Sequence, residues 1–258
     1  MKPSRRAARA VVVALAALGA LTQARAHYPV LSPDAPRVEK GEVVTVGCWV
    51  GHPFVDDRFP MARPTRVRAF NPLGVATDLT GELERFGAPE TPAWRVAFTP
   101  DKTGDWTLSW QLQVFEPPQR RVTDHAKVVV HVGRDQVGWS RPLGDPLEIV
   151  PLTRPYGLPA GAAFRGQVLE QGRPMLGGVV EAETYHRGPL PDPLPELAAY
   201  RRAERTDPTG CFAIGLDRPG WWLLSVATDG GPGEQGGVPI VTRAALWVFV
   251  GDLPPPRR

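Results

Sequence analysis

Three histidines are placed where they could bind a transition metal together. Cleavage after Ala26 would make His27 the first residue of the mature chain. The free α-amine and the imidazole of an N-terminal histidine can chelate one metal ion, such as copper or nickel. His52 and His125 are predicted to lie at strand ends, where loops can bring several ends together. The set would supply three or four nitrogen donors, and imidazole suits nickel, copper, zinc and iron.

Other residues with metal-binding chemistry are less favoured as ligands. His131 falls within a strand expected over Lys127–Val132, on the face opposite three valines, and we expect it to face solvent. Cys48 lies four residues before His52 and is an alternative ligand. Asp56 and the adjacent Asp57 are typical of a solvated loop. The alternative for all of the histidines is that they are unrelated surface residues.

The first 26 residues have the pattern of a secretion signal. Arg5, Arg6 and Arg9 precede an apolar stretch over residues 10–21, and Ala24-Arg25-Ala26 fits a cleavage site. The apolar stretch is shorter than the roughly 20 residues that a membrane-spanning helix needs. No later segment is long and apolar enough to cross a membrane. We therefore expect an exported, periplasmic protein without a transmembrane segment after cleavage.

Composition argues against nucleic acid as a partner. The whole chain has a formal net charge of +3. Without the five basic residues of the signal, 25 basic residues face 27 acidic ones, for a net charge of −2. Binding to phosphates depends on a surplus of lysine and arginine. The sequence also lacks a nucleophile elbow, an H-E-x-x-H helix, a P-loop and a C-x-x-C motif, so we expect a protein that is not an enzyme.

The segments that must position these histidines are predicted to be strands. Short apolar runs bounded by Gly, Pro, Asp and Asn recur along the chain, as in all-β sandwiches. Every second residue is apolar over 106–112, so Trp106, Trp110 and Leu112 are expected to face a core. The one helical candidate is Leu194–Ala203.

A turn-rich stretch over residues 133–161 predicts two domains. We expect a signal peptide at 1–26, an N-terminal β-sandwich with the metal site at 27–140, a C-terminal β-sandwich at 141–251 and a tail at 252–258. Cys48 and Cys211 fall in different domains. The sequence leaves open whether they form a disulfide or remain two buried free thiols.

Several segments occur in the order found in one family. They are Ala26-His27-Tyr28-Pro29, Gly51-His52-Pro53-Phe54, Asp124-His125, Gly138-Trp139 and the stretch from Pro146 to Leu152. The chain resembles a family of exported proteins of unknown function that is described as the periplasmic component of cobalt/nickel ABC transport systems. The resemblance implies that nickel or cobalt is bound and is delivered to a membrane metal-uptake transporter. The histidine ligands by themselves leave copper or zinc as alternatives. His27, His52 and His125 are the matching positions.

The predicted second domain has a resemblance of its own. Phe164–Leu169, Gly172–Pro174, Thr206–Gly210 and Gly220–Trp222 are similar to a carboxypeptidase-regulatory or transthyretin-like sandwich. Such modules are mostly structural or adhesive. The first domain would then be an immunoglobulin-like sandwich.

Three functions are compatible with these observations. The leading hypothesis is a periplasmic nickel- or cobalt-binding protein. The second is a two-sandwich surface, adhesion or interaction module whose histidines bind no metal. The third is a copper histidine-brace oxidase, in which an N-terminal histidine and a second histidine hold copper on a β-sandwich.

Overall fold

The computed structural model describes residues 27–116, 120–228 and 240–255. The predicted signal peptide and the last three residues of the predicted tail lie outside these ranges. The described chain is nearly all β, with three sheets and two short 3₁₀ turns, which confirms the predicted fold class. None of its helices is long and apolar enough to cross a membrane.

The first sheet carries the N-terminal strand. Its path is β1 (Tyr28–Pro33), β3 (Val44–His52), β8 (Ala93–Phe98) and β7 (Glu84–Phe86), and β4 (Asp57–Phe59) pairs with the far end of β3. All of these pairs are antiparallel. Strand β1 therefore lies beside the strand that ends at His52.

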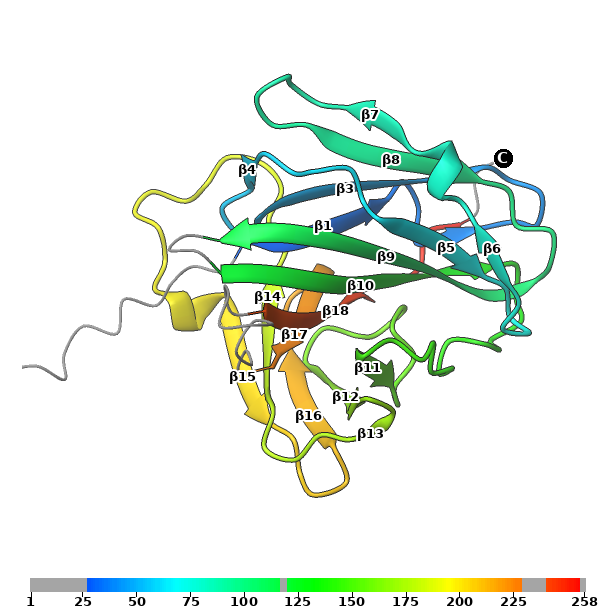
Figure 1. Cartoon of the computed structure of the whole chain (residues 1–258). Helices are drawn as coiled ribbons and strands as arrows, with labels where there is room; N and C mark the ends of the chain where they lie inside the picture. Colours follow the sequence, from blue (N-terminus) through cyan, green and yellow to red (C-terminus); the bar gives the residue numbers. More distant parts are fainter. Residues whose placement is uncertain (1–26, 117–119, 229–239, 256–258) are drawn as a thin grey trace, which may run out of the picture.

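The second sheet has nine strands and runs through most of the molecule (Figure 1). Its path is β15 (Arg201–Arg205), β14 (Val179–Thr184), β17 (Gly220–Ala227), β18 (Ile240–Val250), β10 (Arg120–Val132), β9 (Gly104–Glu116), β5 (Arg66–Phe70) and β6 (Ala76–Asp78). Strand β2 (Arg37–Val38) also pairs with β10. Strands β10 and β18 are parallel, so strands from both predicted domains share this sheet.

The third sheet and the two turns complete the fold. The sheet consists of β11 (Leu147–Pro151), β12 (Ala162–Glu170), β13 (Arg173–Pro174) and β16 (Cys211–Leu216). The turns are η1 (Thr80–Glu82) and η2 (Leu197–Ala199). The predicted helix over Leu194–Ala203 was wrong, because that range holds only the short turn η2 and the start of β15 at Arg201.

Strands β17 and β18 bury both of their faces. Leu223 and Trp247 point into a core shared with the first sheet, whereas Leu224 and Leu246 point into a core shared with the third sheet. This alternation follows from the two-residue period of a strand. Buried residues from both sides of the predicted boundary near residue 140 share one core. The division into two domains therefore stays a prediction.

Strand β10 is also buried on both faces, and this explains why the prediction for His131 was wrong. Trp106, Trp110 and Leu112 are buried as predicted. His131, predicted to face solvent, is only 3% exposed. Its Nδ1 lies 2.8 Å from Oδ1 of Asp105, and its ring stacks on Tyr156 with ring centres 4.8 Å apart. The sequence pattern of alternating polar residues does not reveal that a polar face is covered by another segment of the chain.

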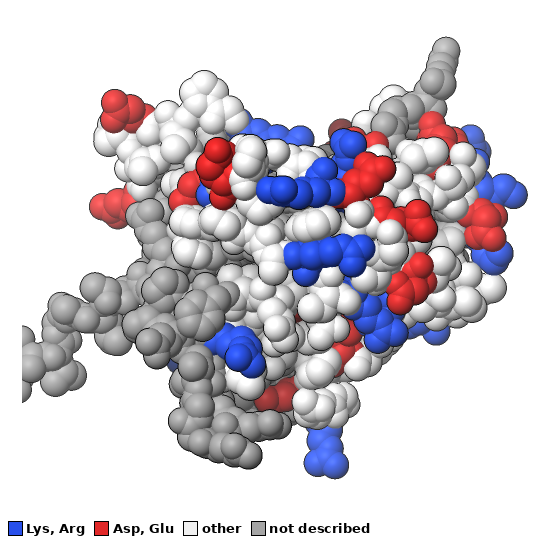
Figure 2. Space-filling model, turned by 45° about the horizontal axis from the view of Figure 1, so that its top comes forward, with Lys and Arg blue, Asp and Glu red and all other residues white. Residues whose placement is uncertain are grey.

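Charged side chains of both signs share the surface. Figure 2 shows lysine and arginine side by side with aspartate and glutamate on the face it presents. Basic residues therefore do not dominate that face, which fits the small net charge of the chain after residue 26.

Candidate metal centre

Strand pairing places His27 and His52 opposite each other. In the β1–β3 ladder Tyr28 pairs with Gly51, and continuing this register by one residue brings His27 opposite His52. Residues directly opposite in an antiparallel pair project to the same face. The two ring centres are 5.0 Å apart and the ring planes meet at 70°. The His27 ring also stacks on Phe59, with ring centres 3.7 Å apart.

The same geometry brings a carboxylate to His52. In the β3–β4 ladder His52 pairs with Asp57. Nδ1 of His52 lies 2.8 Å from each oxygen of the Asp57 carboxylate, and the backbone N–H of His52 donates to Oδ1 at 2.9 Å. A carboxylate only accepts hydrogen bonds at neutral pH, so Nδ1 carries the proton. Nε2 is then left with its lone pair.

This Nε2 atom has no hydrogen-bond partner in the part of the chain that the structure describes, and it is buried. A buried acceptor without a partner costs about 1–3 kcal/mol. Histidines that bind metals commonly donate their other ring N–H to a carboxylate, which fixes the tautomer and the ring orientation. The His52–Asp57 pair has this arrangement.

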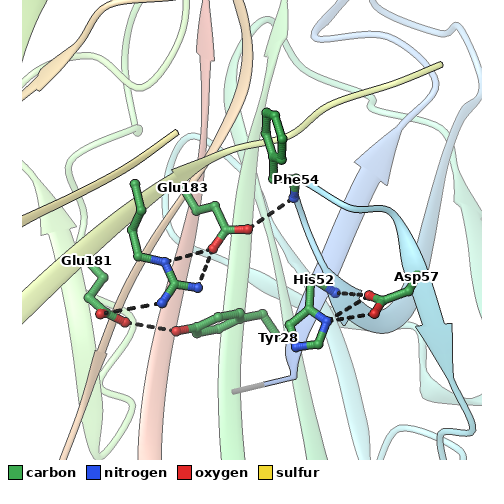
Figure 3. Close-up of polar contacts among 7 residues, drawn as sticks. Tyr28, His52, Phe54, Asp57, Glu181 and Glu183 are labelled. Atoms are coloured by element: carbon green, nitrogen blue, oxygen red, sulfur yellow. Dashed lines mark hydrogen bonds and ion pairs between the residues drawn. The ribbon is translucent and has the colours of Figure 1, made fainter. Parts of the chain in front are cut away.

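A second polar cluster lies beside His52 (Figure 3). Arg201 donates from Nε and Nη2 to Oε2 of Glu183 at 3.0 and 2.6 Å, and the backbone N–H of Phe54 donates to Oε1 of the same residue at 3.0 Å. The hydroxyl of Tyr28 donates to Oε2 of Glu181 at 2.9 Å. Burial, together with the negative charge of Glu181, raises the pKa of Tyr28 above its usual range. This phenol therefore stays protonated.

A pocket of about 250 Å³ opens between His52 and this cluster. It is lined by His52, Val55, Glu183, Leu194, Pro195, Leu197, Tyr200 and Arg201. The walls combine apolar side chains with one arginine–glutamate ion pair.

His125 does not join the other two histidines. Its neighbour Asp124 is paired with Arg243, and Arg243 donates from Nη2 to the carbonyl of His27. Because successive residues of a strand project to opposite faces, His125 points away from His27. Its Nδ1 instead lies 3.7 Å from Oδ1 of Asp145. His125 was predicted to precede a strand, whereas it lies within β10, which already begins at Arg120.

Cys48 also lies away from the histidine pair. It lies four positions before His52 on β3, a distance of about 13 Å at about 3.3 Å per residue. Its side chain is buried in the core. Burial and the nearby charge of Asp124 raise the pKa of its thiol. Cys48 and the half-buried Cys211 are both free cysteines.

Within the residues that the structure describes, no group of three or more His, Cys, Asp or Glu side chains could hold a metal ion. The α-amine of a processed His27 is a main-chain donor, so it does not count among these side chains. Asp57, expected in a solvated loop, contacts the His52 ring instead. Its signal was the short turn after His52, which brings the fifth residue back beside the ring.

A family model described as "Domain of unknown function (DUF4198)" matches residues 24–230. No curated protein sequence matches the chain. Among solved structures, it is similar to a DUF4785 family protein from Legionella pneumophila subsp. pneumophila str. Philadelphia 1, with 12% identity and a TM-score of 0.32 over 78% of this chain and 52% of that one. It is also similar to Salmonella alpha-2-macroglobulin reacted with methylamine, with 13% identity and a TM-score of 0.28 over 86% of this chain and 15% of that one. The chain thus spans about half of the first protein and a small part of the second.

Proposed function

The chain belongs to the DUF4198 family of domains of unknown function, and we propose that its mature form is a periplasmic protein that binds one nickel or cobalt ion. The ion is cargo, captured for delivery to a membrane uptake system. The observation that carries this proposal is the opposed pair of His27 and His52 rings, with the second ring oriented by Asp57.

The donor set consists of the His27 α-amine, the His27 ring and Nε2 of His52. Metal–imidazole bonds are about 2 Å long, so a bound ion lies about 3 Å from each ring centre. Ring centres 5.0 Å apart fit one shared ion. The unpartnered Nε2 of His52 supports its assignment as a ligand, because an ion would satisfy its lone pair.

The residue that precedes His27 determines whether the amine is available. A peptide bond at His27 removes the basicity of this nitrogen. Cleavage after Ala26 is therefore part of the proposal, and so is export to the compartment where a signal peptidase acts. His125 has no part in this site, because it lies on the opposite face of β10.

The test is calorimetric titration of the chain beginning at His27 with Ni²⁺, Co²⁺, Cu²⁺ and Zn²⁺. We expect one tight site for Ni²⁺ or Co²⁺. A chain with one added glycine before His27, and a His52→Ala variant, should each bind at least tenfold more weakly. The matched control is His125→Ala, which should keep the affinity of the parent.

Two other outcomes of the titration would favour a different function. Tight binding of Cu²⁺ alone, with peroxide formed when a reductant is added, would favour a histidine-brace oxidase. Equal and weak binding by the parent and both altered chains would leave a structural or adhesive module.

A further inference from the structure

The pocket beside His52 is larger than a single ion requires. Its volume of about 250 Å³ is enough for a small organic molecule, and His52 forms part of its wall. Val55, Leu194 and Leu197 supply apolar surface at the same pocket. A site for a bare ion has no need of such walls, because the ion contacts nitrogen or oxygen donors alone.

The proposed ligand set also leaves the ion incomplete. One amine and two imidazoles are three donors, whereas nickel and cobalt commonly take four to six. The remaining positions must be filled by water or by donors from another molecule. Since His52 lies at the wall of the pocket, a molecule in the pocket can reach an ion bound to Nε2.

The charges around the pocket define what kind of molecule fits. The charged side chains among the lining residues, Glu183 and Arg201, form an ion pair with each other. Because this pair is neutral overall, the lining residues offer no unpaired cation to a chelator with several carboxylates. A ligand with a single carboxylate, whose charge the divalent ion neutralises, suits such walls.

We propose that the pocket holds the organic part of a metal chelate, namely an α-amino acid with an apolar or aromatic side chain. The inference rests on the proposed function. The amine and carboxylate of the amino acid occupy two open positions on the ion. Its side chain lies against Val55, Leu194, Leu197 and Tyr200. The protein then recognises the metal and its small ligand together.

The experiment uses the nickel-loaded chain beginning at His27, with L-phenylalanine and glycine as probes. Both amino acids chelate through the same two atoms, and only phenylalanine has a side chain that can fill the pocket. Nickel affinity is measured first without any amino acid. Retention of each radiolabelled probe is then measured by equilibrium dialysis, with and without nickel.

We expect about one phenylalanine per nickel, bound at least tenfold more tightly than glycine, and no retention without the metal. Leu194→Trp should fill the pocket and remove the preference for phenylalanine while leaving affinity for nickel alone within twofold. Leu190→Trp is the matched control, because Leu190 is also exposed, at 40% against 50% for Leu194, and does not line the pocket.

Each contrary outcome has a distinct meaning. Equal retention of phenylalanine and glycine, or an unchanged preference in Leu194→Trp, overturns the pocket proposal and leaves nickel binding intact. Loss of nickel from the protein to either amino acid also overturns it. If nickel alone does not bind, the proposed function and this inference fail together.

Discussion

Asp57 decides which nitrogen of His52 faces a ligand. The carboxylate contacts Nδ1 through both oxygens and so keeps the proton there. Without this acceptor the ring can rotate or take the other tautomer, in which Nε2 carries the proton and cannot bind an ion. Under the proposed function, Asp57 is not itself a ligand but controls the affinity of His52 for the ion.

We expect Asp57→Asn to weaken nickel binding by about 10- to 100-fold, the range typical of carboxylates behind metal-binding histidines. Calorimetric titration of the chain beginning at His27 measures the change. Asp56→Asn is the matched control, because Asp56 has a φ of 49° that asparagine also adopts and its carboxylate contacts Tyr185 instead. Equal affinities for Asp57→Asn and the parent would show that Asp57 does not position His52.

The two thiols differ in environment, and this difference is measurable. Burial and the charge of Asp124 raise the pKa of Cys48, so its reactive thiolate is scarce at neutral pH. Cys211 is half-buried on β16. In the folded protein we expect one thiol to react quickly with a disulfide reagent and the second to react only on unfolding. Cys211→Ser should abolish the fast reaction. A fast reaction that persists in this variant would contradict the buried position of Cys48.

At the scale of elements, β11 and the segment before it are held to β10 by buried polar contacts. Lys127 on β10 donates to Oε1 of Glu148 at 2.6 Å, and the backbone N–H groups of Leu143 and Gly144 donate to the same carboxylate. His125 on the same strand faces Asp145. This fastening lies where the sequence predicts a boundary between domains.

The fastening predicts acid sensitivity. Burial alone would raise the pKa of Asp145, but the hydrogen bond and charge of His125, with Lys127 and Arg68, lower it below its ordinary value. The stability that Asp145 contributes is therefore present above its unfolded pKa of about 3.9 and is lost as pH falls through the lower folded value. Urea denaturation between about pH 6 and pH 3 should show a smaller loss of unfolding free energy in Asp145→Asn than in the parent.

The exposed residue Asp101 provides the control for that measurement. Its side chain is 68% exposed beside Lys102, so Asp101→Asn should keep the acid sensitivity of the parent. Parallel pH curves for the parent and Asp145→Asn would show that the lowered pKa of Asp145 does not contribute to stability.

Local patterns predicted the fold class and named both histidines of the proposed site. Alternation over residues 106–112 correctly placed Trp106, Trp110 and Leu112 in a core, because strand period is a local property. The position of His125 was not accessible in this way. The polar stretch before Lys127 indicates a loop, but pairing with β9 and β18 extends β10 back to Arg120. The pairing with β18 depends on residues more than one hundred positions away.

At the scale of the whole molecule, the nine-stranded sheet joins segments that the sequence assigns to different domains. Val128 of β10 lies beside Trp247 of β18, and the indole N–H of Trp247 donates to the carbonyl of Pro29 at 3.1 Å. Trp247 is fully buried. Strand β18 is therefore a structural part of the segment that holds the histidine pair.

A fragment of residues 27–140 should not fold by itself. It would lack β18, leaving one edge of β10 unpaired and the core around Trp247 open. We expect the fragment to show no cooperative unfolding in urea, whereas the chain from His27 should unfold cooperatively. Circular dichroism and tryptophan fluorescence provide the measurement. Cooperative unfolding of the fragment would instead support an autonomous N-terminal sandwich.

The contacts of His27 and Pro29 with β18 have a consequence for synthesis. Arg243 and Trp247 hold main-chain atoms 216 and 218 positions earlier in the chain. A ribosome that stops before codon 240 releases a polypeptide in which neither contact can form. Only a molecule translated through Trp247 can form both contacts with its first residues, so products truncated before β18 would be deprived of the proposed metal site.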